Sequence, residues 1–428
     1  MASKTKRRDA GSGALYQDAR GFWTATVELP PATDGKRRRK VIRAKDKGVA
    51  QAKLRELRRE LDRAGDLATS SPTVETWMRT WLDRIARPRL KPNTLTTYRG
   101  QVDRYIIPAI GRIRLDKLTP AHVRRVHDLA SDGRSSTTAL QAHRILAKAL
   151  KDAEREGRVT RNVAALVDAP RKAASTRGAL TVGEARALLL SVSDDAHAAA
   201  RWSVALLAGL RQGEALGLTR TMVDLERVAI GPDGQPVPAP VITVSWQLQR
   251  LRWEHGCGPG PKTKANPWPC GRRRAGSCPQ RHVDIPPDQE VRQVHGGLWL
   301  TRPKSRAGWR EVPVAPHLRA VLERYFEQMP PGDEGLIFHR PDGHPIDPSD
   351  DAEAWDRALK AAGLPDVPLH SARHTTATLL HALGVSERVR VTVLGHSSAT
   401  VTAGYTHVTD AEAAEGMGRL GALVLPSA

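Results

Sequence analysis

The sequence LHSARH at residues 369–374, followed by LGH at 394–396 and then by Tyr405, decides which fold and chemistry this chain encodes. His370 and Arg373 are three residues apart, so a helix would place both side chains on one face. Histidines, a fixed cation and a phenol in one region favour a phosphodiester substrate. The phenol could attack phosphorus while the cations hold the charge that develops on the phosphoryl oxygens.

The composition favours a polyanionic partner. The chain has 428 residues, which is enough for roughly two to four domains with cores of their own. Lys and Arg total 67 against 46 for Asp and Glu, which gives a net charge of +21. Such a surplus points to nucleic acid, although a basic protein with another role is the alternative.

No feature of the sequence suggests a membrane or secreted protein. No apolar run approaches the ~18 residues that would span a bilayer. The basic N-terminus is not followed by the apolar stretch of a secretory signal. The three cysteines all lie between Cys257 and Cys278 and do not make a disulfide framework. We therefore expect a cytoplasmic protein without membrane association.

The N-terminal part predicts a small sheet with one helix. Alternation of apolar and polar residues indicates strands over 14–17 and 22–29, and residues 36–43 can return as a third strand. The basic run KRRRK at 36–40 lies beside this sheet, which favours phosphate contact over a merely solvated loop. The helix that follows is marked by an apolar stripe of Ala50, Leu54, Leu57 and Leu61.

A segment of helices is expected from about residue 72 to 170. Ser71 and Pro72 predict its first helix start, with Ser71 as the N-cap. A second helical pattern, from Leu95 to Tyr105, is expected to stop at Pro108 and Gly111. Two further helices complete a bundle whose exposed faces carry Arg and Lys.

The C-terminal half predicts a mainly helical domain with a few strands. Thr181 and Glu184 form a capping box, and a nearly continuous apolar helix over 202–210 runs into Arg211. Strands are expected at 228–230 and 241–244, and a hairpin over 298–314 with Lys304 at its turn. Helices are expected to resume at Pro316 and to continue to Tyr405.

Each polar residue in this half has an ordinary interpretation when it is taken alone. Arg211 could form an ion pair with Glu214, Lys304 could be a solvated surface lysine, and Tyr405 could be a half-buried aromatic residue. Their order and local settings nevertheless follow one pattern. The matching segments are Leu210-Arg211-x-x-Glu214, Pro303-Lys304-Ser305, Arg310-x-Val312-Pro313, Leu369-His370-x-x-Arg373-His374, Leu394-Gly395-His396-Ser397 and Tyr405.

This pattern closely resembles that of the tyrosine recombinases, the phage-integrase family. The resemblance extends over residues 11–410 and is more specific after residue 170. It implies an α+β multidomain fold. Residues 11–65 would form an arm-type DNA-binding domain with a three-stranded sheet and a helix, residues 71–170 a helical core-binding bundle, and residues 177–428 a mainly helical catalytic domain with a small β-sheet or hairpin.

The resemblance also implies the roles of the catalytic residues. Two arginines and a histidine would bind the non-bridging oxygens of the scissile phosphate. A second histidine would accept the proton of the tyrosine hydroxyl, whose free pKa near ~10 makes it a poor nucleophile. A lysine would protonate the leaving 5′ oxygen, and Glu214 would orient the first arginine. Arg211, Arg373 and His396 would bind the phosphate oxygens. His370 would accept the proton of the Tyr405 hydroxyl, and Lys304 would protonate the leaving oxygen.

The product would be a 3′-phosphotyrosine, so no metal, ATP or other cofactor is expected for cleavage and rejoining. The expected partners are double-stranded DNA at attachment sites, further copies of the chain in a homotetramer on that DNA, and an accessory DNA-bending or excision factor. The expected function is the integration or excision of a phage genome or mobile element.

Three other functions share some of these features. Type IB topoisomerases use the same chemistry to relax DNA, but two DNA-binding units before the catalytic domain favour recombination. A DNA-binding regulator without catalytic activity would not need the full set of catalytic residues. A metal nuclease could use Asp350, Asp351 and Glu353, which are more simply the acidic first turn of a helix.

The cysteine-containing loop between residues 244 and 298 is not explained by the family pattern. It holds all three cysteines with two histidines, and zinc takes four such ligands in a tetrahedron. No pair has the common Cys–Cys spacing, so the alternative is a flexible insertion whose basic residues touch the DNA backbone. Both interpretations stay open. The five candidate ligands are His255, Cys257, Cys270, Cys278 and His282; the basic residues are Lys262, Lys264 and Arg272 to Arg274.

Overall fold

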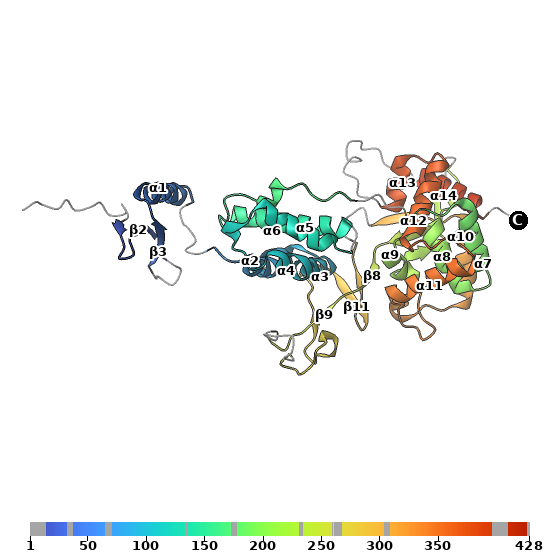
Figure 1. The fold of residues 1–428 in the computed structure, drawn as a ribbon. Coiled ribbons are helices and arrows are strands. Elements are labelled where there is room, and N and C mark those ends of the chain that lie inside the picture. Colours follow the sequence, from blue (N-terminus) through green and yellow to red (C-terminus); the bar gives the residue numbers. More distant parts are fainter. Residues whose placement is uncertain are drawn as a thin grey trace, which may run out of the picture. The chain divides into compact units, whose positions relative to one another are not determined.

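The chain divides into two compact units, residues 1–173 and residues 174–428 (Figure 1). The first unit holds a small sheet with a helix and a separate helical bundle, and the second is mainly helical with several small sheets. The computed structural model describes residues 14–31, 37–64, 71–133, 136–172, 178–230, 234–258, 260, 268–303, 309–395 and 410–425.

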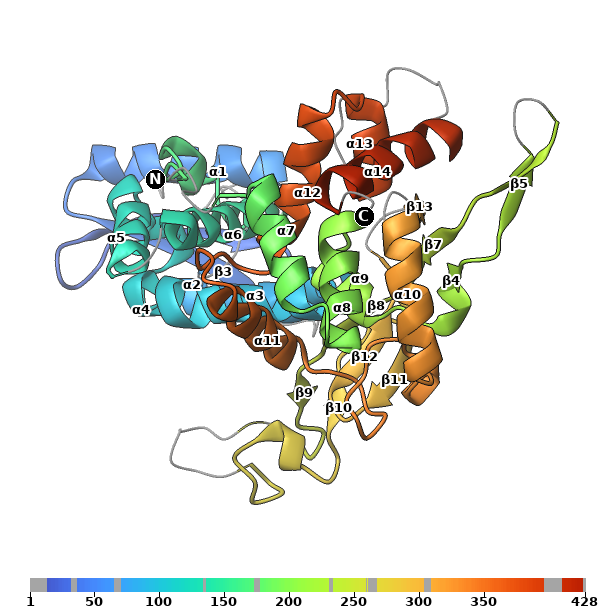
Figure 2. The same cartoon turned by 90° about the vertical axis from the view of Figure 1, so that its right-hand side faces the viewer.

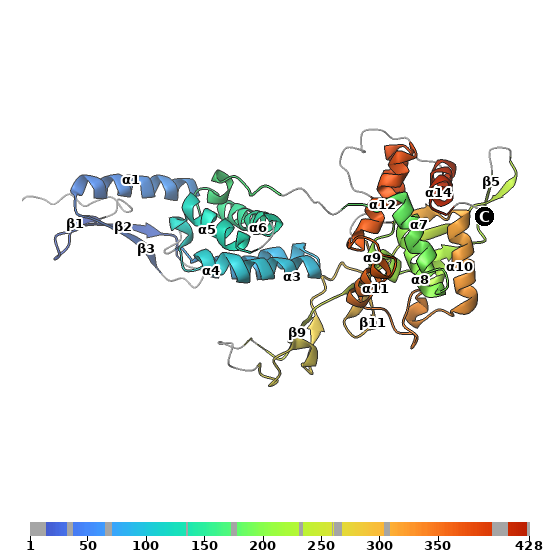
Figure 3. The ribbon, with the colours of Figure 1, turned by 45° about the vertical axis from the view of Figure 1, so that its right-hand side comes forward.

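The N-terminal part of the described chain is a three-stranded antiparallel sheet covered by one helix, as predicted. The strands β1 (Ala14–Gln17), β2 (Trp23–Leu29) and β3 (Arg38–Ala44) pair in this order. Helix α1 (Lys47–Ala64) packs its apolar stripe against β2 (Figure 3). In the basic run at 36–40, Lys36 lies outside the described residues and the last three members belong to β3.

The helical bundle has a core of its own. Two tryptophans, one on the first helix and one in the π-helical turn that directly follows it, reach helix α6 and bind it through their indole N–H groups. Trp77 donates to the carbonyl of Ala149 at 3.1 Å, and Trp81 donates to the Asp152 carboxylate at 2.9 Å. The α-helices are α2 (Val74–Thr80), α3 (Pro92–Gln101), α4 (Ile107–Ile110), α5 (Pro120–Ser131) and α6 (Ser136–Arg155).

The predicted start of the first helix is wrong. Thr73 caps α2, since its hydroxyl accepts a hydrogen bond from the Thr76 amide at 3.2 Å. Ser71 instead accepts a hydrogen bond from the backbone N–H of Asp116 at 3.1 Å. The chain before α2 is therefore held by the loop that ends α4, and it turns into the helix two residues later than local sequence suggested.

Pro108 does not stop the second helix as predicted, whereas the other predicted stop, Gly111, is confirmed. A π-helical turn over residues 102–106 links α3 to α4, and the helical run ends at Gly111. Pro108 stands in the first turn of α4, where a missing N–H is tolerated. The wider turn before it changes the hydrogen-bond pattern that a proline inside an α-helix would disrupt.

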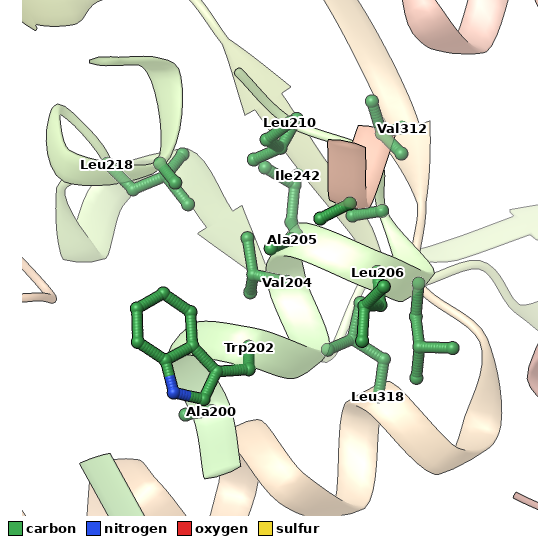
Figure 4. Close-up of a cluster of buried hydrophobic side chains, with 14 of the residues drawn as sticks. Ala200, Trp202, Val204, Ala205, Leu206, Leu210, Leu218, Ile242, Val312 and Leu318 are labelled. Carbon is green, nitrogen blue, oxygen red and sulfur yellow. The ribbon is translucent and has the colours of Figure 1, made fainter. Parts of the chain in front are cut away.

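The second unit is built around helix α8 (Ala196–Leu207), whose residues from Ala200 onward are buried. Figure 4 shows Trp202, Val204 and Leu206 of this helix among apolar side chains from other elements. The helix ends at Leu207 and not at Leu210 as predicted. Around it pack α7 (Val182–Ser191), which starts with the predicted capping box, α10 (Pro316–Gln328), α12 (His370–Ala382) and α14 (Asp410–Val424).

Two small antiparallel sheets lie beside these helices. Strand β7 (Val241–Val244) pairs with β13 (Arg310–Pro313) and with β4 (Val223–Asp224). Strand β8 (Gln247–Arg250) pairs with β12 (Leu298–Thr301), which also pairs with β11 (Val291–His295). The predicted strand at 228–230 is β5 (Val228–Ile230), which forms a ribbon with β6 (Pro236–Pro238) (Figure 2).

The hairpin predicted over 298–314 is wrong, because β12 and β13 pair with different strands. Residues 241–250 form one interrupted antiparallel ladder with 298–313. The pairing stops at Thr301 and resumes at Arg310, on either side of Ser245 and Trp246 in the opposite segment. Lys304, which was predicted at the turn of this hairpin, lies outside the described residues, as do residues 305–308.

Within the described ranges, none of the helices is both long enough and apolar enough to span a bilayer.

Candidate active site

Arg211 lies in the turn between α8 and α9 (Gln212–Leu216). Gly209 makes this turn with φ +62°, and a Cβ there would come within 2.7 Å of the Leu394 side chain. The Arg211 backbone N–H and Nη1 donate to the two carboxylate oxygens of Glu214 at 2.9 and 2.6 Å, and its Nη2 donates to the Gly395 carbonyl at 2.9 Å. The Arg211 side chain keeps 38% of its surface exposed, so it can meet a ligand.

Glu214 is buried and also binds Arg310 of β13, an arginine without a role in the expected catalytic set. The two Nη atoms of Arg310 donate to the two carboxylate oxygens at 3.2 and 2.8 Å, and its Nε donates to the Val393 carbonyl at 2.7 Å. Burial alone would raise the pKa of Glu214. The hydrogen bonds and charge of Arg310, aided by Arg211, outweigh burial and hold that pKa below its ordinary value.

Arg373 of α12 is the third arginine of the site and is buried. Its Nη1 donates to the Gly209 carbonyl at 2.8 Å, and its Nη2 donates to the Leu394 carbonyl. Burial and the charges of Arg211 and Arg310 lower the pKa of Arg373 to about 9, which leaves it protonated at neutral pH. Three guanidinium groups therefore lie in one site with a single carboxylate, which pairs with only two of them, and an incoming anion would relieve their repulsion.

Two buried threonines fix α12 against its neighbours. The hydroxyl of Thr376 donates to the Leu206 carbonyl of α8 at 2.8 Å. The hydroxyl of Thr375 accepts the backbone N–H of Leu180 at 2.8 Å. Because these bonds lie in the turn after Arg373, they hold the guanidinium of Arg373 at a set position relative to the end of α8.

His370 begins α12 and shares the helix with Arg373, as its spacing predicted. Its ring meets that of His374 edge-on, with the centroids 4.8 Å apart. Partial desolvation, followed by the fields of His374, Arg373 and Arg211, lowers the pKa of His370. The imidazole is therefore neutral at pH 7 and can accept a proton.

The structure thus brings Arg211, His370 and Arg373 into one site. Lys304, His396 and Tyr405 lie outside the described residues, and their catalytic roles stay predictions, as do those of the other three. The chain directly before His396 does reach the site. Helix α13 (Glu387–Leu394) ends there, and the carbonyls of its last residue and of the glycine that follows bind two of the arginines.

The ends of the segment that holds Lys304 are fixed by a stack of cation and aromatic groups. The guanidinium of Arg302 lies 3.6 Å from the ring centroid of Trp246 and 4.5 Å from that of Trp309. Arg302 also donates to the Ser245 carbonyl at 3.2 Å and to the Glu290 carboxylate at 2.8 Å. No sequence motif pointed to Arg302, whereas Arg310 stood inside a quoted motif and could have been found there.

The structure argues against the metal-nuclease alternative, because Asp351, one of its three candidate ligands, already binds an arginine. Asp351 is buried in a two-bond ion pair with Arg201, with N–O distances of 2.9 and 2.8 Å. Gln212 adds a further hydrogen bond to the same carboxylate at 3.0 Å. Asp350 and Asp351 belong to the first turn of α11 (Pro348–Ala361), which confirms their interpretation as an acidic helix start.

Comparison with known proteins gives one consistent family. The model of the phage integrase N-terminal SAM-like domain matches residues 73–128, and the model of the phage integrase family matches residues 288–412. A protein of Saccharopolyspora erythraea named integrase is 29% identical over 433 residues, covering 96% of each chain.

Solved structures of integrases share the fold. The integrase of the transposon Tn1549 in complex with transposon right end DNA aligns with a TM-score of 0.58 at 20% identity, over 81% of this chain and 99% of the other. A lambda integrase tetramer bound to a Holliday junction aligns with a TM-score of 0.51 at 16% identity, over 93% of this chain and 99% of the other. These neighbours confirm the expected α+β multidomain fold.

Proposed function

This chain is a tyrosine recombinase of the phage integrase family, and we propose that it cuts and rejoins DNA at attachment sites through a 3′-phosphotyrosine on Tyr405. It is a site-specific recombinase, and the proposed outcome is the integration or excision of a phage genome or mobile element. One observation carries the proposed mechanism. Arg211 and Arg373 both bind carbonyls at the end of α13, immediately before His396 in the chain.

The proposed cleavage step moves one proton at each end of the reaction. The Tyr405 oxygen attacks phosphorus and gives its proton to His370, whose lowered pKa leaves it neutral and able to accept one. The bond from phosphorus to the 5′ oxygen breaks, and Lys304 protonates that oxygen. Rejoining is the same sequence in reverse, and the phosphotyrosine bond conserves the energy of the phosphodiester.

The arginines stabilise the transition state by position and charge. Arg211 is partly exposed and already oriented by Glu214, so little conformational freedom is lost when it binds a non-bridging oxygen. Arg373 supplies the second guanidinium, and His396 is proposed to donate a further hydrogen bond. A planar guanidinium suits this role because it can bind two oxygens of a phosphate at once.

Double-stranded DNA is the partner, and the protein acts on it as an oligomer, which we propose to be a homotetramer like that of lambda integrase on a Holliday junction. We propose that residues 11–65 bind arm-type sites and that residues 71–170 bind the core site. The net charge of +21 and the SAM-like match at 73–128 support these assignments. We also infer a cytoplasmic location, where this DNA is found.

Substitution of the nucleophile tests the proposal. A nicked duplex that carries the attachment site, recovered from the DNA beside the gene, traps the covalent adduct for a denaturing gel. Tyr405→Phe should give no adduct and should bind the duplex within about threefold of wild type, because the phenol forms the bond but contributes little to binding. Tyr105→Phe, in the helical bundle, should still give the adduct. An adduct from Tyr405→Phe would refute the assignment.

A further inference from the structure

Within the cysteine-containing loop, the described residues from 251 to 284 form a part of the second unit without a hydrophobic core of its own. Its base is a two-stranded ribbon of β9 (Trp253–Glu254) and β10 (His282–Val283), which continues away from β8 and β12 (Figure 2). Among the described residues from 252 to 284, Cys278 is the one side chain that is buried. Apolar packing therefore does not explain how this loop keeps its shape.

Four potential metal ligands converge at the centre of the loop. One ligand atom from each of His255, Cys257, Cys270 and Cys278 lies within 4.8 Å of the other three. The Nδ1 atom of His255 is 3.8 Å from the Cys257 sulfur and 3.6 Å from the Cys270 sulfur. His282, the fifth candidate from the sequence, does not belong to this group.

These distances fit a single tetrahedral zinc ion. With Zn–S bonds of about 2.3 Å and Zn–N bonds of about 2.0–2.1 Å, tetrahedral geometry separates two sulfurs by about 3.8 Å and a sulfur from a nitrogen by about 3.6 Å. Both observed N–S distances are close to the second value. Three thiolates and one imidazole form a common structural zinc set, and soft sulfur ligands disfavour Mg²⁺ and Ca²⁺.

The backbone of the loop is shaped to let these side chains meet. A Cβ at Gly256, between the first two ligands, would come within 2.2 Å of the Gln280 carbonyl, so only glycine permits this approach of the two chain segments. Gly271 directly follows Cys270 with φ +70°, a conformation that favours glycine. Residues far apart in the sequence thus reach one point through turns that other side chains would strain.

The imidazole of His255 is oriented by an aromatic neighbour, and no hydrogen bond with a described residue at its Nε2 atom turns the ring away from the cysteines. Its ring stacks on Trp268, with the centroids 4.0 Å apart and the planes 7° from parallel. Its Nε2 atom is buried and has no hydrogen-bond partner among the described residues. The aromatic stack therefore orients the ring, and its Nδ1 faces the sulfur atoms.

We propose that His255, Cys257, Cys270 and Cys278 bind one Zn²⁺ ion, which stabilises the loop in place of a hydrophobic core. The cysteines are free thiols in the structure, so the site does not compete with a disulfide. The bound set of three thiolates, one neutral imidazole and Zn²⁺ carries a charge of −1, and the exposed Arg272, Arg273 and Arg274 lie beside it in sequence. The proposal does not depend on the recombinase mechanism.

Metal analysis of the full chain, purified without a histidine tag, tests the site. Elemental analysis should find about one zinc per chain in the wild type. Cys270→Ser and Cys278→Ser should each hold less than about a tenth of that amount. His282→Ala is the matched control, because it removes a histidine of the same loop outside the cluster, and it should keep the zinc. Metal-free wild-type protein, or full zinc in Cys278→Ser, would overturn the proposal.

A second measurement separates loss of metal from loss of folding. In the native wild type the three thiols should react slowly with a thiol reagent, and a chelator should make all three react quickly. Cobalt added to the metal-depleted protein should produce the charge-transfer absorption of thiolate ligation. Circular dichroism should show that the serine variants keep their helices. Thiols that react at once in folded, untreated wild type would also overturn the proposal.

Discussion

Replacement of Glu214 with glutamine tests whether one buried carboxylate holds the active-site arginines in place. Glu214 accepts four hydrogen bonds, two from Arg211 and two from Arg310, so both of its oxygens face two donors. Glutamine keeps the shape but places an NH₂ group opposite two N–H donors, and it removes the negative charge. Arg310 would stay buried without its partner, which costs about 3–5 kcal/mol in comparable ion pairs.

The expected effect is a large fall in thermal stability. For a domain of this size each kcal/mol shifts the midpoint by roughly 2–4 °C, so Glu214→Gln should lower the midpoint of the catalytic domain by roughly 6–20 °C. Calorimetry of the full chain measures it. Below both midpoints, adduct formation should slow by about 10–100-fold, because Arg211 loses its orientation.

Glu311→Gln is the matched control, on the strand that carries Arg310. Glu311 forms an exposed ion pair with Arg227 at 2.5 Å, and such pairs contribute at most about 1 kcal/mol. Its midpoint should therefore stay within about 4 °C of wild type. If Glu214→Gln shifts the midpoint no more than this control and cleaves DNA within about threefold of wild type, the carboxylate does not organise the site.

Two further predictions concern proton transfer. Because the pKa of His370 lies below its ordinary value of 6.5, adduct formation should slow as pH falls and the imidazole becomes protonated, with the midpoint of that fall below pH 6.5. A midpoint at about pH 7.5, or a fall that persists unchanged in His370→Ala, would contradict its role as the base. Lys304→Ala should cleave slowly, and a substrate with sulfur at the 5′ bridging position should restore cleavage because a thiolate leaves without a proton; absence of rescue would mean that another group is the acid.

Local patterns in the sequence were enough to predict the elements whose stability is local. The alternation in β2, the apolar stripe of α1 and the capping box at Thr181 each depend on residues within a few positions of one another. The hairpin over 298–314 failed for the opposite reason. Strand β12 pairs with β11 and with β8, and β13 pairs with β7, so the two predicted arms of the hairpin do not pair with each other. An apolar strand pattern does not say which strand it pairs with.

The candidate site shows the same limit. The resemblance supplied the residues and their order, but it gave Arg310 no role and gave no reason for Gly209. Both become intelligible only from tertiary contacts. Arg310 matters because it shares the carboxylate of Glu214, and Gly209 matters because Leu394 and Thr376 come too close for any side chain there. Such contacts join residues from distant parts of the chain and leave no periodic signal in the sequence.

The main chain, more than the side chains, determines where the active-site cations lie. Helix α13 ends with Val393 and Leu394 and is capped by Gly395, and Gly209 lies in the turn after α8. The last carbonyls of a helix have no partner within it and carry its partial negative charge. Here the carbonyls at the end of α13 accept N–H groups from all three arginines of the site, and the Gly209 carbonyl accepts a second one from Arg373.

The end of α13, together with the Gly209 carbonyl, thus provides a frame of fixed partial negative charge for three guanidiniums, only two of which bind the carboxylate of Glu214. The frame cannot titrate and changes little when side chains move. A phosphate that enters the site would add the charge that the frame lacks, so the arginines can be held in position before the substrate arrives.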